Sequence, residues 1–294
     1  MKTAVNLFLW TDFVQEEHLK HFTELKQAGY DGVEIPLLMG EAAHYQRFAR
    51  AIQDEGLECI ATSNCMPDKN LISGDASERQ RAIDHLKWAV DMSHILDSRL
   101  IGGPIHSTPG QFTGEPPTKN EQGWAAEGLH QVATYSLQND IHLAVEYLNR
   151  FESYLACSMQ ITLDLVQAVD HSHVGIHLDT HHAHYEENDI AAAIILAKGH
   201  IKHVQLSESN RGTAGKGLIN FAEVVEALKQ IAYDQWITIE AFSDKNPTLV
   251  KALHLWRPLY ESEEEVYRAG IHLIKKLWWE LLTEPSQLTN TKNC

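Results

Sequence analysis

The sequence predicts an α/β protein built as a single-domain (β/α)8 TIM barrel, and three observations support this. Short apolar runs typical of buried parallel strands alternate strictly with amphipathic stretches typical of helices. The alternation repeats eight times, which allows a parallel sheet to close into a barrel. The length of 294 residues exceeds the roughly 250 residues typical of such a barrel. A doubly wound open sheet has the same alternation and is the alternative architecture.

The expected strands are short apolar runs rich in β-branched and aliphatic residues. In chain order they cover residues 4–10, 32–38, 57–63, 99–106, 141–148, 174–180, 201–207 and 236–241. The stretches between them carry apolar residues at helical spacing, and we expect helices at 17–27, 42–54, 78–96, 121–138, 163–169, 190–198, 221–231 and near 263–282. We assign residues 1–283 to the barrel and residues 284–294 to a polar tail without periodicity.

The charge balance restricts the possible partners. Lysine and arginine number 24 against 40 acidic residues, which gives a formal net charge of −16. This charge repels phosphate backbones and anionic lipid, so we expect neither a nucleic-acid partner nor a membrane partner. The cysteines have no CxxC spacing, and no apolar run approaches the roughly 18 residues of a membrane span. We expect a soluble, reduced, cytoplasmic protein.

Acidic residues end three of the expected strands. The runs Ile-His-Leu-Ala-Val-Glu146, Val-Gly-Ile-His-Leu-Asp179 and Trp-Ile-Thr-Ile-Glu240 belong to the fifth, sixth and eighth strands, whose carboxyl ends form the active-site face of a barrel. The seventh strand brings Gln205 to the same face. Three carboxylates and one amide oxygen suit a hard divalent cation; we expect Mn²⁺, with Mg²⁺ or Co²⁺ as alternatives. Each acid could instead cap the following helix or pair with an arginine.

Several motifs around these acids resemble one known family. They are Val145-Glu-Tyr-Leu-Asn-Arg-Phe-Glu-Ser-Tyr-Leu155, Leu178-Asp-Thr-His-His182, Ser207-Glu-Ser-Asn-Arg-Gly212, Glu240-Ala-Phe242 and Trp256-Arg-Pro-Leu259. Together they resemble the D-tagatose/D-allulose (psicose) 3-epimerases of the xylose-isomerase-like TIM barrel superfamily. The resemblance covers nearly the whole chain in order. It implies that Glu146, Asp179 and Glu240 bind the metal. It also implies a substrate pocket formed by Glu152, His182, Arg211, Phe242 and Cys65.

The chain departs from these epimerases at one ligand position. Gln205 stands where they carry a metal-binding histidine on the seventh strand. His203 faces the same side of the strand but lies about 6.6 Å deeper, which is too far to replace that ligand. The hydroxypyruvate isomerase group of the same superfamily resembles this chain in carrying a glutamine here, so we expect Gln205 to be the fourth metal ligand.

The chemistry implied by the resemblance requires two acids. Inverting C3 of a 2-ketose removes a proton next to the carbonyl group, forms an enediolate and returns a proton to the opposite face. Glu146 and Glu240, on non-adjacent strands, could serve the two faces, while the metal stabilises the enediolate charge. We therefore expect an isomerase of carbohydrate metabolism, a ketose 3-epimerase that acts on a free sugar. We also expect a homo-oligomer, either a dimer or a tetramer.

Other functions remain open from the sequence. The chain could be an aldose–ketose isomerase for a hydroxypyruvate-like or phosphorylated substrate, or a non-catalytic sugar-binding barrel. The glycine-rich loop 211–217 could cradle a phosphate, although it lacks the GxxxxGK[ST] spacing. The cluster His181, His182 and His184 could suggest zinc, but no thiolate accompanies it. A DNA-repair endonuclease of the same fold is disfavoured by the negative charge.

Overall fold

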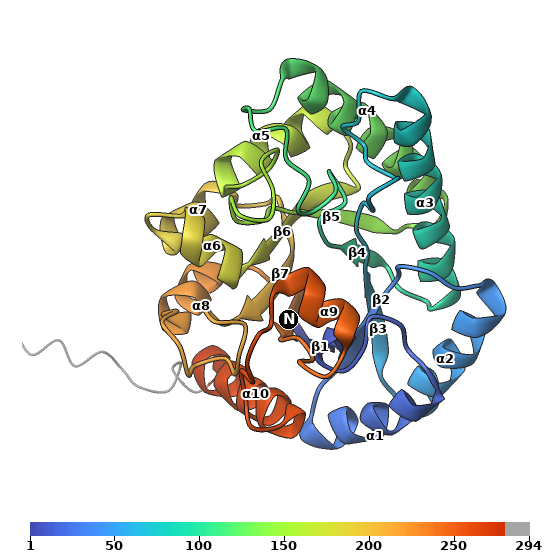
Figure 1. The fold of residues 1–294 in the computed structure, drawn as a ribbon. Coiled ribbons are helices and arrows are strands. Elements are labelled where there is room, and N and C mark those ends of the chain that lie inside the picture. Colours follow the sequence, from blue (N-terminus) through green and yellow to red (C-terminus); the bar gives the residue numbers. More distant parts are fainter. Residues whose placement is uncertain (280–294) are drawn as a thin grey trace, which may run out of the picture.

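The computed structural model describes residues 1–279 and shows a closed barrel of eight parallel strands in chain order, β1 to β8 (Figure 1). The strands are β1 (Lys2–Asn6), β2 (Gly32–Pro36), β3 (Glu58–Thr62), β4 (Leu100–Gly102), β5 (His142–Glu146), β6 (Val174–Asp179), β7 (Ile201–Ser207) and β8 (Trp236–Glu240). Because β1 pairs with β8, the sheet has no free edge. The predicted single-domain barrel is confirmed, and the open-sheet alternative is wrong.

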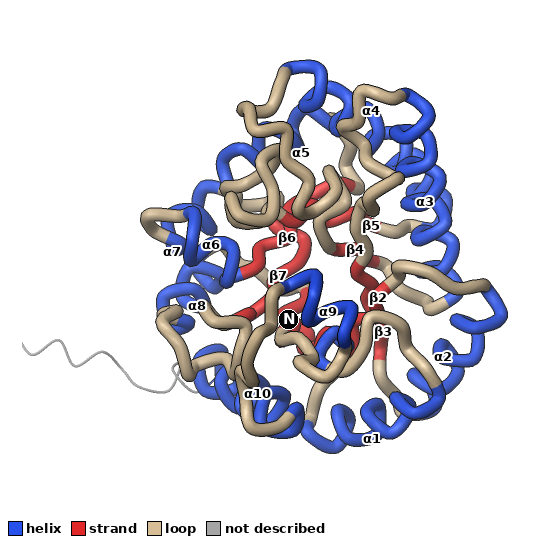
Figure 2. The backbone as a smooth tube through the Cα atoms, in the orientation of Figure 1, coloured by secondary structure: helices blue, strands red, loops and turns tan. Residues whose placement is uncertain are grey.

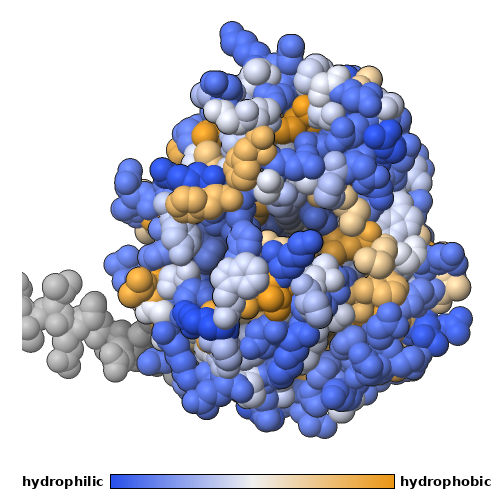
Figure 3. Space-filling view, in the orientation of Figure 1, coloured by the Kyte–Doolittle hydropathy of each residue, from blue (hydrophilic) through white to orange (hydrophobic). Residues whose placement is uncertain are grey.

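Helices surround the strands on the outside, and one short helix, residues 247–253, lies over the strands in this view (Figure 2). They are α1 (Leu19–Ala28), α2 (Ala42–Asp54), α3 (Ala76–Ile95), α4 (Lys119–Ser136), α5 (Met159–Val169), α6 (Thr180–Glu186), α7 (Ile190–Leu196), α8 (Phe221–Gln230), α9 (Pro247–Leu253) and α10 (Glu263–Trp279). The face seen in Figure 3 is mostly hydrophilic, with separate hydrophobic patches. Among residues 1–279, no helix is both long and apolar enough to cross a membrane.

Three differences from the sequence prediction have local causes. The first strand ends at Asn6, whose side chain accepts a hydrogen bond from Phe8 N at 2.9 Å and begins a 3-10 turn. The fourth strand is only Leu100–Gly102, because Gly103 takes a left-handed φ of 115° and Pro104 follows it. The short helices α6 and α9 were not predicted. The predicted tail 284–294 and the predicted helix end at 282 lie outside the described residues.

The barrel interior changes from apolar to polar along its axis. Near the amino ends of the strands, Ala4, Ile60, Leu100 and Ala144 form a small core of their own, against which Trp236 packs. The larger core lies between the strands and the surrounding helices. Toward the carboxyl ends, inward positions are instead occupied by acids, amides and histidines, which are fully or nearly buried. Buried polar side chains concentrated at this end mark it as the candidate site.

Candidate functional site

The expected metal ligands lie at the carboxyl ends of four neighbouring strands. Glu146, Asp179 and Glu240 are the last residues of β5, β6 and β8, and Gln205 lies in β7. Asp179 and Gln205 are register partners, so their side chains point to the same, inner face. Glu146 and Asp179 offer ligand atoms within 4.8 Å of each other and of His182. The sequence therefore located a cluster of buried acids at the barrel mouth.

Arg211 supplies the positive charge among these acids. It follows β7 in a loop and takes a left-handed φ of 63°. Its Nη1 donates to Asp179 Oδ2 and to Glu240 Oε2, both at 3.2 Å. Its Nη2 donates to Glu152 Oε1 at 3.3 Å and lies 3.2 Å from His182 Nε2. One guanidinium group therefore connects the strand-end acids to the residues expected to bind substrate.

Burial and mutual repulsion raise the pKa values of the three strand-end acids. For Glu146 and Glu240 burial is the largest cause, and the charge of Asp179 adds to it. Burial also raises the pKa of Asp179, although Arg211 opposes this shift. Burial alone would lower the pKa of Arg211, but the surrounding acids, with Glu152 first, raise it. Because the buried acids outnumber this one guanidinium, a divalent cation would relieve their repulsion.

The side chain of Gln205 provides a test of whether the site fits a metal. Its Nε2 donates to Glu34 Oε1 at 3.1 Å, whereas its Oε1 is buried and has no hydrogen-bond partner among the described residues. Burial is the main cause that lowers the pKa of His177, and Gln205 opposes this shift. The Gln205 oxygen therefore lies near the His177 ring, although the two side chains do not reach hydrogen-bond geometry. A buried amide oxygen without a hydrogen-bond partner, on the strand between those that carry Asp179 and Glu240, is the ligand type that hard divalent cations prefer. The residues present therefore fit such an ion.

His182 and Glu152 are held by Asn149 in the loop after β5. His182 Nδ1 accepts a hydrogen bond from Asn149 N at 2.9 Å, and Asn149 Nδ2 donates to Glu152 Oε1 at 2.9 Å. Nε2 of His182 lies 3.6 Å from Glu146 Oε1. Burial, followed by the charge of Arg211, lowers the pKa of His182, so its imidazole is neutral. A neutral imidazole at this position can exchange hydrogen bonds with a sugar hydroxyl.

Asp179 also has the simpler role considered from sequence. Its Oδ1 accepts a hydrogen bond from His181 N at 2.7 Å and caps the amino terminus of α6. Its Oδ2 is the atom that faces Arg211. Capping therefore uses one carboxylate oxygen and fixes the side-chain rotamer, while the second oxygen points into the site.

The two remaining expected pocket residues lie on different sides of the site. The Phe242 ring packs 5.0 Å from the guanidinium carbon of Arg211 and 5.6 Å from the Phe8 ring. Cys65 is fully buried, and its thiol lies 3.3 Å from the backbone oxygen of Ile105. Burial raises the pKa of Cys65 to about 12, so the group is a neutral thiol. Phe242 touches the site through Arg211, whereas no hydrogen bond among residues 1–279 joins Cys65 to the acids.

The glycine-rich loop after β7 is organised by the buried carboxylate of Glu208. Its oxygens accept hydrogen bonds from the backbone amides of Ser209, Gly215, Leu218 and Ile219 at 2.7, 2.9, 3.1 and 3.2 Å. A Cβ on Gly217 would collide with the Glu208 carboxylate, which explains a glycine there. These amides are therefore bound to a carboxylate of the chain itself, and the loop is not a free phosphate cradle.

The three histidines do not form one common metal-binding group among residues 1–279. His181 and His182 approach Glu152 within 4.8 Å, but His184 belongs to no such group. Burial lowers the pKa of His181 to about 2, and its Nδ1 lies 3.1 Å from the backbone oxygen of Glu208. His181 therefore supports the loop through its Nδ1.

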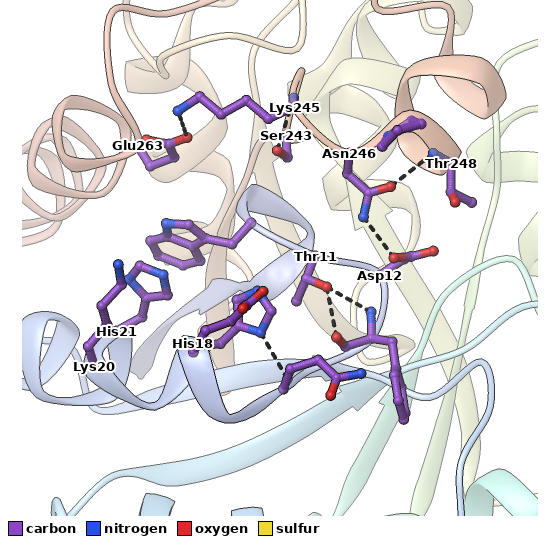
Figure 4. Close-up of a pocket in the computed structure, with 15 residues that line it drawn as sticks. Thr11, Asp12, His18, Lys20, His21, Ser243, Lys245, Asn246, Thr248 and Glu263 are labelled. Atoms are coloured by element: carbon purple, nitrogen blue, oxygen red, sulfur yellow. Dashed lines mark hydrogen bonds and ion pairs between the residues drawn. The ribbon is translucent and has the colours of Figure 1, made fainter.

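A cavity of about 650 Å³ opens beside the barrel mouth, but it contains none of the expected site residues (Figure 4). It lies between the segment after β1 and the segment after β8. Two hydrogen bonds join side chains that line it: Lys245 donates to Glu263 Oε1 at 2.6 Å, and Asn246 donates to Asp12 Oδ1 at 2.8 Å. We therefore assign the chemistry to the buried acids and not to this cavity.

Sequence reasoning missed several residues that shape the site. Glu34 accepts a hydrogen bond from Gln205, and Asn149 donates to His182 and Glu152. Glu208 holds the loop after β7, and Asn6 donates to Glu240 Oε1 at 3.4 Å. The acid in the run Gly-Val-Glu34-Ile-Pro was a usable signal, because a carboxylate inside a buried strand needs a partner. The roles of the other three depend on tertiary contacts.

Comparison with known proteins identifies the class to which this fold and site belong. The chain matches the family model described as "Xylose isomerase-like TIM barrel" over residues 22–277. It belongs to this family.

The relatives within the family are more specific. A probable ketose 3-epimerase of Synechocystis sp. is 28% identical over 285 residues, covering 95% of this chain and 97% of the relative. A D-psicose 3-epimerase of Enterocloster bolteae is 27% identical over 276 residues, covering 91% and 92%. A solved structure of an L-ribulose 3-epimerase has a TM-score of 0.89 at 26% identity, covering 97% of this chain and 99% of that one. The resemblance to ketose 3-epimerases, which are isomerases, is confirmed.

Proposed function

We propose that this protein is a divalent-metal-dependent ketose 3-epimerase that inverts C3 of a free ketose. The observation that carries the proposal is the buried set Glu146, Asp179 and Glu240, completed by the unpaired oxygen of Gln205. Relatives that are ketose 3-epimerases over nearly the whole chain support the same conclusion.

The four residues Glu146, Asp179, Gln205 and Glu240 would hold the cation. Their all-oxygen character favours Mn²⁺, with Mg²⁺ or Co²⁺ as alternatives, over zinc. When bound, the ion supplies Lewis acidity that stabilises negative charge on the substrate oxygens. The excess of buried acids over Arg211 supports this assignment, because in the free site burial and neighbouring acids disfavour the ionised form of these groups, and a cation would offset both effects.

Glu146 and Glu240 would transfer the protons. In the barrel, β6 and β7 separate their strands, so the two carboxyl groups can serve opposite faces of a sugar between them. One carboxylate removes the proton from C3, and the other, protonated, returns a proton to the opposite face. Two acids are needed because a single carboxylate cannot easily reach both faces of C3.

The surrounding side chains would orient the sugar. Arg211, His182 and Glu152 form a connected polar edge next to the acids and can bind substrate hydroxyl groups. Phe242 would cover an apolar face of the sugar, and we retain Cys65 as a more distant wall of the pocket. The Glu208 carboxylate already uses the loop amides, which favours a free sugar over a sugar phosphate.

One experiment separates the candidate functions. The purified protein loaded with Mn²⁺ is incubated with D-fructose, D-tagatose and ketopentoses, and the configuration at C3 is followed by NMR. Inversion at C3 supports the proposal. Aldose formation would identify an aldose–ketose isomerase, and binding without turnover would identify a sugar-binding barrel. A cytoplasmic homodimer or homotetramer remains part of the proposal; sedimentation of the purified chain measures the assembly.

A further inference from the structure

Glu34 is a fully buried acid on β2 that takes no part in the chemistry proposed above. Its side chain points into the barrel, beneath the candidate metal ligands. Its Oε1 accepts a hydrogen bond from Gln205 Nε2 at 3.1 Å, and its Oε2 lies 3.1 Å from His203 Nε2. Both partners belong to β7, which is separated from β2 by β1 and β8 around the barrel. The pair of contacts makes Glu34 the support for the side chain of Gln205.

A glutamine needs such a support in order to bind a cation. Its amide has two ends of nearly equal shape, one an oxygen acceptor and the other an NH2 donor. The donor end repels a cation, and nearby carboxylates attract it, so an unrestrained Gln205 would turn its NH2 group toward the strand-end acids. A histidine ligand presents a ring-nitrogen lone pair to the metal and has no amide group that could turn its NH2 end toward the cation. The substitution of glutamine for histidine therefore requires a neighbour that selects one orientation.

Glu34 determines which end of the Gln205 amide faces the metal site. A carboxylate only accepts hydrogen bonds, so the amide group that faces it must be the NH2 group. The oxygen of Gln205 then points away from Glu34, and this oxygen is the buried atom without a partner. His203 contacts the second carboxylate oxygen through its Nε2, which limits rotation of the Glu34 side chain.

We infer that Glu34 is a positioning residue, which holds Gln205 with its oxygen toward the cation bound by Glu146, Asp179 and Glu240. This inference rests on the proposed function, because it assumes a cation at that site. Groups that orient metal ligands in this way typically change metal affinity about 10- to 100-fold when they are replaced.

The test is an exchange of the carboxylate and the amide between the two positions. Glu34→Gln removes the selection, and we expect the affinity for Mn²⁺ in calorimetric titration to fall about 10- to 100-fold. Gln205→Glu places two carboxylates against each other and should lower the melting temperature of the metal-free chain. In the double variant, the amide of residue 34 can donate to the new carboxylate at 205. We therefore expect Mn²⁺ affinity to recover to the wild-type level and the melting temperature to rise above that of Gln205→Glu.

Glu121→Gln is a matched control. Glu121 is also a buried acid whose oxygen accepts a backbone hydrogen bond, from Thr118 at 2.6 Å, but it lies at the start of α4. This variant should lose stability and keep wild-type Mn²⁺ affinity. General destabilisation is thereby separated from loss of ligand orientation.

The outcomes distinguish this inference from the proposed function. Wild-type Mn²⁺ affinity in Glu34→Gln, or a double variant no better than Gln205→Glu, would overturn the inference. A chain that binds Mn²⁺ without inverting C3 would refute the proposed function, and the Glu34→Gln titration would still decide the role of Glu34. A wild-type chain that binds no Mn²⁺, Mg²⁺ or Co²⁺ would overturn both.

Discussion

Replacing Arg211 by methionine removes the one guanidinium group among the buried acids while keeping a long side chain. The change deletes the hydrogen bonds to Asp179 and Glu240 at 3.2 Å and the bond to Glu152 at 3.3 Å. Removing one partner of a buried ion pair typically costs about 3–5 kcal/mol. Because the raised pKa values allow the acids to take up protons instead, we expect about 3 kcal/mol. For a chain of this size, that loss lowers the melting temperature by roughly 6–12 °C.

The same variant separates substrate binding from metal binding. Loss of a charge-assisted hydrogen bond to the sugar, about 1.5–3 kcal/mol, should reduce kcat/KM about 10- to 150-fold. The Nη1 group of Arg211 competes with a cation for oxygens of Asp179 and Glu240, so Mn²⁺ should bind the variant at least as tightly as the wild type. Thermal melts with and without Mn²⁺, calorimetry and initial rates measure the three quantities. Weaker Mn²⁺ binding in Arg211→Met would refute this reasoning.

Two further predictions concern other parts of the molecule. Burial lowers the pKa of His85 from 6.5 to about 4. Between these pH values the unfolded chain therefore binds more protons than the folded chain. The buried, neutral His85 contributes about 3 kcal/mol of stability above pH 6.5, and this stability is lost as the pH falls toward 4. His85→Gln should flatten the pH dependence of chemical denaturation in this window, whereas His94→Gln, on the exposed side of the same helix, should leave it unchanged. Gln205→His should retain epimerase activity and bind Mn²⁺ at least as tightly, because an imidazole can bond to Glu34 through one nitrogen and bind metal through the other; calorimetry showing weaker binding would contradict this.

The fold was predictable because its determinants are local. Apolar runs and helical periodicity alternate along the chain, and eight repeats suffice to close the sheet. The elements that the sequence did not predict lack such a local pattern. The helix Thr180–Glu186 is rich in histidine and lacks an apolar stripe, and Pro247–Leu253 is only two turns long, so periodicity could not indicate either. The shortness of β4 depends on the backbone at Gly103, which no pattern of apolar residues reports.

The candidate site was only partly predictable from the sequence. Glu146, Asp179 and Glu240 could be found because each ends an apolar run, and strand ends gather at one face of a barrel. Glu34 lies within such a run, and its partner Gln205 is 171 residues away in the sequence. A carboxylate that serves a residue so distant becomes visible only when the barrel closes.

The central claim is that Glu146 and Glu240 exchange protons at opposite faces of C3, and turnover in D₂O tests it most directly. Metal-loaded enzyme and its preferred ketose are incubated in D₂O, and the position of deuterium in the product is determined by NMR. The proposed mechanism predicts deuterium at C3 and little at C1 or C2, because the returned proton comes from a carboxylic acid that exchanges with solvent. Deuterium at C1 or C2, with C3 unlabelled, would contradict it and identify an aldose–ketose isomerase.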